Sequence, residues 1–433
     1  MNYPETLAYL FNTLPLFSRI GPAAYKKDLT NTIALCDALD HPEKKFPSIH
    51  VGGTNGKGSV SHMLAAVFNA AGYTTGLYTS PHVYDFRERI RVNGIGIEED
   101  FVVGFVEKMR PLMESIHPSF FEITVAMAFD YFVEKKVDIA IIEVGLGGRL
   151  DSTNIIQPQL SVITNIGWDH MNMLGDTLNA IATEKAGIIK QDTPVVIGEK
   201  HPETEKIFRD TAAAQQAPIT FAEEVFSVQD YKLHSNHIDI SVRSKTGETK
   251  DYSLDLPGIY QTKNLLTVLA AIKQLPQWKL EQRTVLQALR RVKQTTGLHG
   301  RWETLRERPA LVLEVAHNKE GVLQMLEHLR HLEYRQLHLI IGMVKDKDPD
   351  GVLSLLPTSA NYYFTQAQIP RALEAAALQQ EAQRFGLKGS SFGHVHEAVQ
   401  AAWQLAEPED LIVVSGSIFL VGEVDRNLVA QLS

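Results

Sequence analysis

The N-terminal half of the chain alternates between short apolar runs and longer amphipathic stretches. The apolar runs, rich in β-branched residues, lie at 48–53, 74–80, 138–145, 160–166 and 194–198. The stretches with helical spacing lie between them, at 58–71, 100–115, 121–135 and 177–190. Continuous apolar strands separated by amphipathic helices are typical of a parallel sheet that helices cover on both faces. The pattern therefore predicts an α/β domain built on a mostly parallel sheet.

The pattern changes in the middle of the chain. Polar and apolar residues alternate in "HIDISVRS" at 237–244 and in "DYSLDL" at 251–256, which predicts a small antiparallel insertion within 225–257. Helical spacing then returns at 261–274 and 281–292.

The segment "KQTTGLHGR" at 293–301 interrupts the helical spacing with two glycines and two threonines, and we place a domain boundary there. Beyond it the alternation restarts. Strands are predicted at 310–315, 337–343, 362–366 and 411–417, and helices from about Lys319 and Ala372. The sequence thus predicts two domains, 1–296 and 297–433, of which the second is smaller and also α/β.

The composition narrows the class of protein without identifying it. Apolar residues make up 44% of the chain, which is close to globular averages and argues against disorder. A formal charge of −9 argues against an extended nucleic-acid surface, which would need a basic stripe. The single cysteine, Cys36, excludes an intrachain disulfide. The N-terminus lacks the features of a secretory signal, and no apolar run reaches the roughly 18 residues of a membrane-spanning helix, so we expect a cytoplasmic protein.

The residues "GGTNGKGS" at 52–59 follow a predicted strand and open a predicted helix. Gly53 and Gly56 allow the backbone to approach a phosphate closely, and an exposed Lys57 would supply a positive charge beside the free N–H groups of the helix start. This context favours a phosphate-binding loop over a plain glycine-rich turn. Such loops normally place Ser or Thr directly after the lysine to bind magnesium, but here that residue is Gly58. A hydroxyl from elsewhere would have to take this role.

A second block, "IIEVGLGGRLDSTN" at 141–154, contains a predicted strand that ends in Glu143. Ligands of open α/β sheets bind beyond the carboxyl ends of the strands. We therefore expect Glu143 to lie beside the loop, although a solvated glutamate at a strand end is the simpler alternative.

A third block covers 164–190 and contains His170 and Lys185. A core or capping role is the first interpretation of a lone histidine. Lys185 falls on the apolar face of the predicted helix 177–190, which it shares with Leu178, Ile181, Ala182 and Ile189. A lysine on an inward face must either extend its amine to solvent or lose its charge.

These blocks, with others in the same order along nearly the whole chain, resemble folylpolyglutamate synthase and dihydrofolate synthase, members of the Mur ligase superfamily of ATP-dependent amide-forming enzymes. The matching blocks include "HVGGTNGKGSV" (50–60), "YTSPHVYDFRERI" (78–90), "FFEITVAMAF" (120–129), "LPGIYQTKN" (256–264), "LHGRWE" (298–303), "EVAHNKEG" (314–321) and "SGSIFLVGE" (415–423). The resemblance implies an N-terminal P-loop ATPase domain and a C-terminal Rossmann-like domain that binds glutamate, with catalysis in the cleft between them.

The resemblance also implies roles for individual residues. The phosphates of ATP would be bound by Asn55, Gly56, Lys57, Gly58 and Ser59, and the rest of the nucleotide by Asn264, Arg301, Glu314, His317 and Asn318. Magnesium would be bound by Ser80, Glu143 and His170, and the pterin-bearing substrate would lie near Pro81, His82, Phe121, Glu122 and Arg149. Lys57, Lys185 and His170 would be catalytic, with Lys185 carbamoylated. Ser80, from "TSPH", would thus replace the hydroxyl that Gly58 lacks.

One position departs from the family pattern. The "AHN" block usually has Asp two residues before its alanine, whereas this chain has Glu314. The carboxylate is kept but reaches one methylene further toward the ribose of the nucleotide, to which the resemblance assigns it.

The implied reaction transfers the γ-phosphoryl group of ATP to a carboxylate, and the amine of L-glutamate then attacks the acyl phosphate. The carboxylate would be the γ-carboxyl of a folate glutamate tail or the benzoate of dihydropteroate, and the sequence leaves both open. The expected partners are these small molecules and ATP, without nucleic acid or membrane, and a monomer is expected.

Two alternatives remain open. One is a cell-wall Mur ligase, but such an enzyme would carry a whole additional domain before the loop. In this sequence 52 residues precede Gly53. A nucleotide-dependent switch would explain the loop but would not need the second α/β domain.

Overall fold

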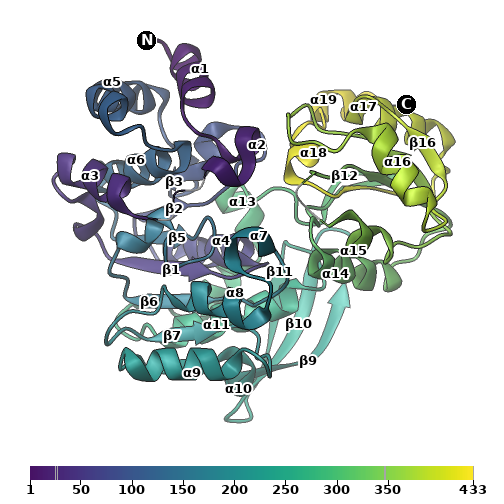
Figure 1. The fold of residues 1–433 in the computed structure, drawn as a ribbon. Helices are drawn as coiled ribbons and strands as arrows, with labels where there is room; N and C mark the ends of the chain where they lie inside the picture. Colours follow the sequence, from purple (N-terminus) through teal and green to yellow (C-terminus); the bar gives the residue numbers. More distant parts are fainter. Residues whose placement is uncertain (25, 27, 346–347, 433) are drawn as a thin grey trace. The chain divides into compact units, whose positions relative to one another are not determined.

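The computed structural model describes residues 1–24, 26, 28–345 and 348–432, and the chain divides into two compact units (Figure 1). The N-terminal unit comprises Met1–Lys232, Asp239–Asp255 and Gln261–Leu298, and the C-terminal unit comprises Leu233–Ile238, Leu256–Tyr260 and His299–Ser433. The main division, after Leu298, falls within the segment 293–301 that interrupts the helical spacing. Each unit has its own sheet with covering helices.

An eight-stranded sheet forms the centre of the N-terminal unit, in the order β4-β3-β2-β5-β1-β6-β7-β8. Its strands are β1 (Ser48–Gly52), β2 (Thr75–Tyr78), β3 (Ile90–Val92), β4 (Ile95–Gly96), β5 (Ile139–Glu143), β6 (Leu160–Ile163), β7 (Val195–Ile197) and β8 (Ile219–Phe221). The strands from β2 to β8 in this order run parallel, and β3 and β4 are antiparallel. The mostly parallel sheet is confirmed, while β3, β4 and β8 were not predicted.

Helices cover both faces of this sheet. The helices of the N-terminal unit are α1 (Tyr3–Thr13), α2 (Phe17–Ile20), α3 (Thr30–Ala38), α4 (Lys57–Ala70), α5 (Glu99–Ile116), α6 (Phe120–Glu134), α7 (Met171–Leu174), α8 (Leu178–Ala186), α9 (Glu205–Ala214), α10 (Ala222–Val225), α11 (Gln261–Lys273), α12 (Gln282–Leu289) and α13 (Val292–Thr296), with 3-10 turns η1 (Gly21–Ala24), η2 (Pro42–Lys44), η3 (Phe86–Arg89) and η4 (Ser152–Ile155). Helices α1, α3, α5 and α6 share one apolar core with β2 and β5. Helix α4 packs against β1, β2 and β5 and also against α11, α12 and α13.

The register of the central strands brings their carboxyl ends to one edge of the sheet. Glu143 at the end of β5 pairs with Val51 of β1, and Ile163 at the end of β6 pairs with Gly52. Tyr78 at the end of β2 pairs with Ile142. The segments that leave β1, β2, β5 and β6 therefore all begin at this edge, where ligands of parallel sheets bind.

A separate three-stranded sheet, ordered β11-β10-β9, follows the large sheet in the chain. It consists of β9 (Phe226–Leu233), β10 (Ile238–Ser244) and β11 (Thr249–Leu254), which are joined by short turns at 234–237 and 245–248. Turns this short require antiparallel neighbours, and this small sheet confirms the insertion expected within 225–257.

The C-terminal unit has a six-stranded sheet in the order β12-β13-β17-β14-β15-β16. Its strands are β12 (Glu303–Glu307), β13 (Ala310–Leu313), β14 (Leu337–Ile341), β15 (Asn361–Phe364), β16 (Gly389–Ser391) and β17 (Leu411–Ser415), and its helices are α14 (Lys319–Arg330), α15 (Pro349–Leu353), α16 (Ala375–Gln383), α17 (Val395–Leu405), α18 (Ile418–Gly422) and α19 (Arg426–Ala430). All neighbouring strands except β12 and β13 run parallel. A second α/β unit, as predicted, is confirmed.

Two predicted helices differ from the structure. The helix expected over 177–190 ends at Ala186, so that Ile189 is buried but lies beyond it. The helix expected over 281–292 is divided into α12 and α13, because the backbone of Arg291 leaves the helical conformation. Among the residues that the structure describes, no helix is both long and apolar enough to cross a membrane.

Candidate functional site

The loop between β1 and α4 is held in place by the segment that follows β6. The backbone N–H of Thr54 donates to the carbonyl oxygen of Asn165 at 3.0 Å, and the N–H of Asn55 donates to the Asn165 side-chain oxygen at 2.9 Å. One asparagine thus holds two consecutive residues of the loop.

Two glycines of this loop could not be replaced without rearrangement. Gly53 has a φ of +139°, and a Cβ atom there would lie 1.9 Å from Oγ1 of Thr164. Gly56 precedes α4 with a φ of +83°, and a Cβ atom there would lie 2.4 Å from Oδ1 of Asn264. The loop therefore requires glycine both for its backbone conformation and for its close contact with neighbouring segments.

Two lysine amines converge on the carbonyl oxygen of Gly53. The Nζ of Lys57 donates to it at 3.2 Å and to the Thr54 carbonyl at 3.0 Å. The Nζ of Lys185, from α8, donates to the same Gly53 oxygen at 2.8 Å. Lys57 is thus half-buried rather than exposed, which corrects the expectation from the sequence. Lys57 supplies the loop with a positive charge that suits an anionic ligand.

Lys185 is the most perturbed cation of the loop. Its side chain is 4% exposed. Burial, with a further contribution from the charge of Lys57, lowers the pKa of Lys185 to about 7, and the carboxylates of Asp169 and Asp151 oppose the shift. Of the two possibilities for a lysine on the apolar helix face, the structure therefore shows the second: the amine of Lys185 is buried and does not extend to solvent. This amine is largely neutral at slightly alkaline pH.

Ser80 and Glu143 lie together beyond the ends of β2 and β5. The backbone N–H of Ser80 donates to Oε2 of Glu143 at 3.4 Å. The Glu143 side chain is 5% exposed, so it is not the solvated strand-end residue of the simpler interpretation. A serine hydroxyl and a buried carboxylate in adjacent positions provide the oxygen ligands that magnesium prefers.

His170 begins α7 with a left-handed backbone, at φ +51°. Its ring makes an edge contact with Phe17 at a centroid distance of 5.9 Å, and its Nε2 lies 3.8 Å from Oδ2 of Asp169. The ring is partly exposed. His170 thus belongs to the same segment as Asn165, which holds the loop between β1 and α4. It is not a core residue, because its ring is partly exposed.

Ser59 has a hydrogen-bond partner outside the loop. Its hydroxyl, which is fully buried, accepts from Nε2 of Gln261 at 3.1 Å, and Oε1 of Gln261 accepts from Nδ2 of Asn264 at 2.8 Å. This chain of side chains ties α11 to the start of α4. Gln261 was not predicted as a site residue, although it lies in the block "LPGIYQTKN".

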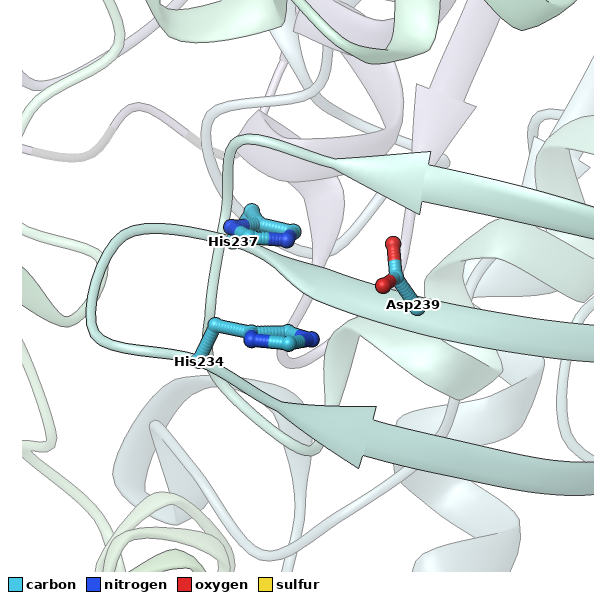
Figure 2. Close-up of side chains that lie close together, drawn as sticks. All are labelled: His234, His237 and Asp239. Atoms are coloured by element: carbon cyan, nitrogen blue, oxygen red, sulfur yellow. The ribbon is translucent and has the colours of Figure 1, made fainter.

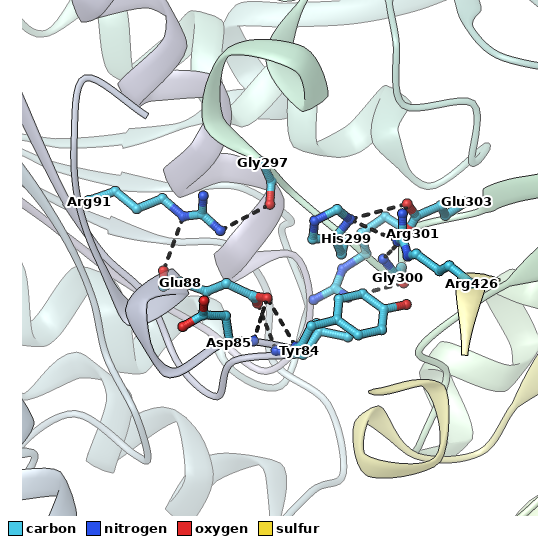
Figure 3. A network of polar contacts seen from close by, with 11 residues as sticks. Tyr84, Asp85, Glu88, Arg91, Gly297, His299, Gly300, Arg301, Glu303 and Arg426 are labelled. Atoms are coloured by element: carbon cyan, nitrogen blue, oxygen red, sulfur yellow. Dashed lines mark hydrogen bonds and ion pairs between the residues drawn. The ribbon is translucent and has the colours of Figure 1, made fainter. Parts of the chain in front are cut away.

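The segment that contains Pro81 and His82 is fixed by one carboxylate. Glu88 accepts from the backbone N–H groups of Val83, Tyr84 and Asp85 at 2.8–3.0 Å (Figure 3). Pro81 is exposed. The ordered segment therefore presents Pro81 at the surface.

His82 and Arg89 form a second contact within this segment. The guanidinium of Arg89, itself 6% exposed, donates from Nε to Nδ1 of His82 at 2.8 Å. Burial and then the Arg89 charge lower the pKa of His82 to about 3. His82 is consequently a neutral hydrogen-bond acceptor toward Arg89, a residue that the sequence-based set omitted.

The other three residues expected near a pterin, Phe121, Glu122 and Arg149, have different environments. The Phe121 ring packs against the turn after β5, where a Cβ atom on Gly145 would lie 2.3 Å from it. Glu122 is buried, and its Oε2 accepts from Ser119 N–H at 2.6 Å in a capping box that starts α6. Its Oε1 has no hydrogen-bond partner among the described residues. Arg149 makes an ion pair with Glu184 at 2.8 Å.

The C-terminal unit holds the remaining predicted residues. Glu314 is 4% exposed, and its Oε2 accepts from the Tyr260 hydroxyl at 2.7 Å and from the Trp302 N–H at 2.8 Å. Burial raises the pKa of Glu314 to about 7, although Tyr260 and the charge of Arg301 oppose the rise. This carboxylate is therefore engaged inside its own unit.

Asn318 and His317 follow β13. The side-chain oxygen of Asn318 accepts from Gly321 N–H at 2.8 Å and caps α14, while His317 is partly exposed. Asn318 therefore has a structural role as the N-cap of α14, and the side chain of His317 takes no part in this cap.

A further polar cluster surrounds Glu303 at the start of β12. Its carboxylate accepts from Arg426 Nη2 at 2.6 Å and from Gly300 N–H at 2.9 Å, and it lies 3.1 Å from Nδ1 of His299 (Figure 3). The block "LHGRWE" contains His299, Gly300 and Glu303, but sequence reasoning selected only Arg301 from it. The side chain of Arg301 donates to the Gly300 carbonyl at 3.2 Å.

Comparison with known proteins places these features in a family. Residues 51–272 match the model of the Mur ligase middle domain, and residues 300–418 match that of the Mur ligase glutamate ligase domain. The chain therefore contains both of these Mur ligase domains.

Individual relatives narrow the assignment. The chain is 33% identical over 404 residues to a dihydrofolate synthase/folylpolyglutamate synthase of Bacillus subtilis, with 90% of this chain and 92% of the relative covered. Its structure is similar to that of Mycobacterium tuberculosis folylpolyglutamate synthase complexed with ADP and AMPPCP, with a TM-score of 0.86, 30% identity and 98% of each chain covered. A structure of Escherichia coli FolC with DHPP and ADP gives a TM-score of 0.86 at 28% identity, over 100% of this chain and 99% of that chain. The chain belongs to the folylpolyglutamate synthase/dihydrofolate synthase family.

Proposed function

We propose that this protein is an ATP-dependent ligase that adds L-glutamate to a folate-type carboxylate through an acyl phosphate. The observation that carries the proposal is the loop at the carboxyl edge of the sheet, where Lys57 and Lys185 share the Gly53 carbonyl, in a chain whose two halves match both Mur ligase domains. Residues 1–296 are assigned to nucleotide binding and 297–433 to glutamate ligation.

In the first step, a γ-phosphoryl oxygen–phosphorus bond of ATP is broken and the substrate carboxylate takes the phosphoryl group. Lys57 and the N–H groups at the start of α4 neutralise the phosphate charge, and Asn55 to Ser59 position it. The amine of glutamate then attacks the acyl carbon and displaces phosphate, which leaves an amide, ADP and a proton. Because the acyl phosphate reacts with water, the site must exclude it during this step.

The residues at the strand ends fit a magnesium ion. Ser80 and Glu143 are adjacent oxygen donors, one of them a buried carboxylate, and His170 would add a nitrogen ligand. When bound, magnesium neutralises phosphate charge. Ser59 is not assigned to it, because its hydroxyl accepts from Gln261.

Lys185 is proposed to be carbamoylated. Carbon dioxide adds only to a neutral amine, and burial supplies one here. The amine nitrogen forms an N–C bond as one C=O π bond of carbon dioxide opens onto oxygen. The nitrogen then releases a proton, so that the neutral amine becomes a carbamate anion. The reaction also removes the repulsion between the amines of Lys57 and Lys185.

The remaining predicted residues are proposed to surround the substrates. Asn264, Arg301, Glu314, His317 and Asn318 are assigned to the nucleotide, and Pro81, His82, Phe121, Glu122 and Arg149 to the pterin-bearing substrate. Among them, Glu122 provides a buried carboxylate oxygen without a partner among the described residues, which suits recognition of a donor group on a pterin. Action as a cytoplasmic monomer remains part of this proposal.

The direct test is release of ADP with glutamate and either dihydropteroate or a reduced folate. The proposal requires ADP release that depends on both glutamate and one of the two carboxylates, with a mass gain of one glutamyl residue in the product. Equal turnover without either acceptor would instead indicate a nucleotide switch. Activity with one carboxylate and not the other decides between dihydrofolate synthesis and polyglutamylation.

A further inference from the structure

The turn between β9 and β10 carries three metal-ligating residue types in the short sequence "HSNHID", at 234–239. The backbone N–H of His234 donates to the carbonyl of His237 at 3.0 Å, so these residues face each other across the hairpin. Residues opposed in this way have their side chains on the same face of the sheet. Asp239, the second residue of β10, follows His237 by two positions and therefore also points to that face.

The structure brings the three side chains together on one face of the hairpin, as the strand pairing predicts. The rings of His234 and His237 are stacked with centroids 4.0 Å apart and planes within 5° of parallel. One ligand atom from each of His234, His237 and Asp239 lies within 4.8 Å of the others. Figure 2 shows the stacked rings with the Asp239 carboxylate beside their edge. Because all three belong to one hairpin, their proximity depends only on local strand pairing.

The geometry points to a binding site for one divalent transition-metal ion: we propose that His234, His237 and Asp239 bind zinc or a metal of similar preference. Two imidazoles with one carboxylate suit zinc, cobalt or nickel, whereas magnesium and calcium prefer oxygen ligands only. Ligands of a tetrahedral ion with bonds of about 2.0–2.2 Å lie about 3.4 Å apart. Binding therefore requires the two parallel rings to rotate until one nitrogen lone pair from each points to the ion. The fourth position would be left to water.

The neighbourhood of the cluster supports this role. Nδ1 of His237 lies 2.7 Å from Oδ1 of Asn236, and a proton on Nδ1 that is donated to this oxygen leaves Nε2 with its lone pair for the metal. The turn is also attached to β12, because the Thr304 hydroxyl donates to the Ser235 carbonyl at 3.4 Å. The three ligand residues are partly exposed, so an ion can reach them from solvent.

The test uses the full chain, stripped with a chelator and dialysed against zinc in the presence of excess magnesium. Elemental analysis is expected to find one zinc ion per chain in the wild-type protein. The double variant His234→Gln/His237→Gln is expected to contain none. Asp239→Asn is expected to weaken binding by about tenfold or more, and Asn236→Ala by about tenfold, since outer hydrogen bonds orient a ligand histidine. Optical absorption of the cobalt form reports the coordination geometry independently.

The matched control is His396→Gln. His394 and His396 are also stacked, with centroids 5.3 Å apart, and both are exposed. This pair tests for unspecific uptake by neighbouring histidines, and its variant should keep the zinc ion. Absence of zinc from the wild type, retention in His234→Gln/His237→Gln, unchanged affinity in Asp239→Asn, or loss in His396→Gln would each overturn the proposal. Circular dichroism melting checks that every variant is folded.

Discussion

Replacement of Lys185 by Met is the sharpest test of the loop chemistry. The side chain of Lys185 is 4% exposed, and its pKa is lowered from 10.5 to about 7, mainly by burial. A shift of this size corresponds to about 5 kcal/mol, at 1.36 kcal/mol for each pKa unit. Near pH 7 about half of this amine is neutral, against roughly one part in three thousand for an ordinary lysine. Lys185 therefore has the neutral amine that carbon dioxide requires, whereas surface lysines are almost entirely protonated at this pH.

The expected result has a chemical and a kinetic part. Wild-type protein equilibrated with 13C-labelled bicarbonate should show one carbamate signal by NMR, and Lys185→Met should lack it. Ligase turnover of the variant should fall by roughly two orders of magnitude, the usual loss when one charged group at the reacting phosphate is removed. Wild-type turnover should also fall in carbon-dioxide-free buffer and recover with bicarbonate.

The same variant gives a stability test in carbon-dioxide-free buffer. The folded state binds fewer protons at Lys185 than the unfolded state between about pH 7 and 10.5, so wild-type stability rises with pH in this window. Relative to Lys185→Met, the free energy of unfolding should increase by about 2 kcal/mol from pH 7 to 9. Chemical denaturation at several pH values measures this difference.

Lys190→Met is the matched control, because Lys190 lies five residues further along, and burial lowers its pKa as well. Its Nζ donates to the Asn154 carbonyl at 2.8 Å, not to the loop. This variant should keep the carbamate signal. A signal that persists in Lys185→Met, or full turnover of that variant, would refute the assignment.

Other predictions follow from the same geometry. Lys57→Ala should lower turnover by roughly two orders of magnitude or more while the protein stays folded, and near-normal turnover would contradict the phosphate-loop assignment. Ser80→Ala should raise the magnesium concentration for half-maximal activity, whereas Ser59→Ala should leave it unchanged and cost about 1 kcal/mol of stability, because Gln261 loses its acceptor; a magnesium shift in Ser59→Ala alone would reverse the two roles. Burial raises the pKa of Glu314 to about 7, so its folded state binds more protons above pH 4.5, and stability should fall by up to about 3 kcal/mol between pH 4.5 and 7. Calorimetry should find a smaller fall in the stability of Glu314→Gln. If the stabilities of wild type and variant instead change in parallel with pH, the Glu314 carboxyl does not titrate in this range.

The sequence by itself determined the features that depend on local pattern. Continuous apolar runs predicted β1, β2, β5, β6 and β7, because strands buried on both faces need no polar side. The short strands β3, β4 and β16 were missed, since they have partly or fully exposed residues and no long apolar run. The order of blocks such as "GGTNGKGS" and "GLGGRLDSTN" identified the family, because each block is a contiguous segment with its own backbone requirement.

Only the tertiary structure decided which groups meet. The pairing of β1 with β5 and β6 places Glu143 beside Ser80 and Asn165 beside the loop, and no local pattern specifies this strand order. The helix face predicted that Lys185 is inward, but the structure alone supplied its contact with Gly53. Hydrogen bonds and burial act through space between segments far apart in the sequence, and that is the physical reason why the chemistry of these residues follows from the fold.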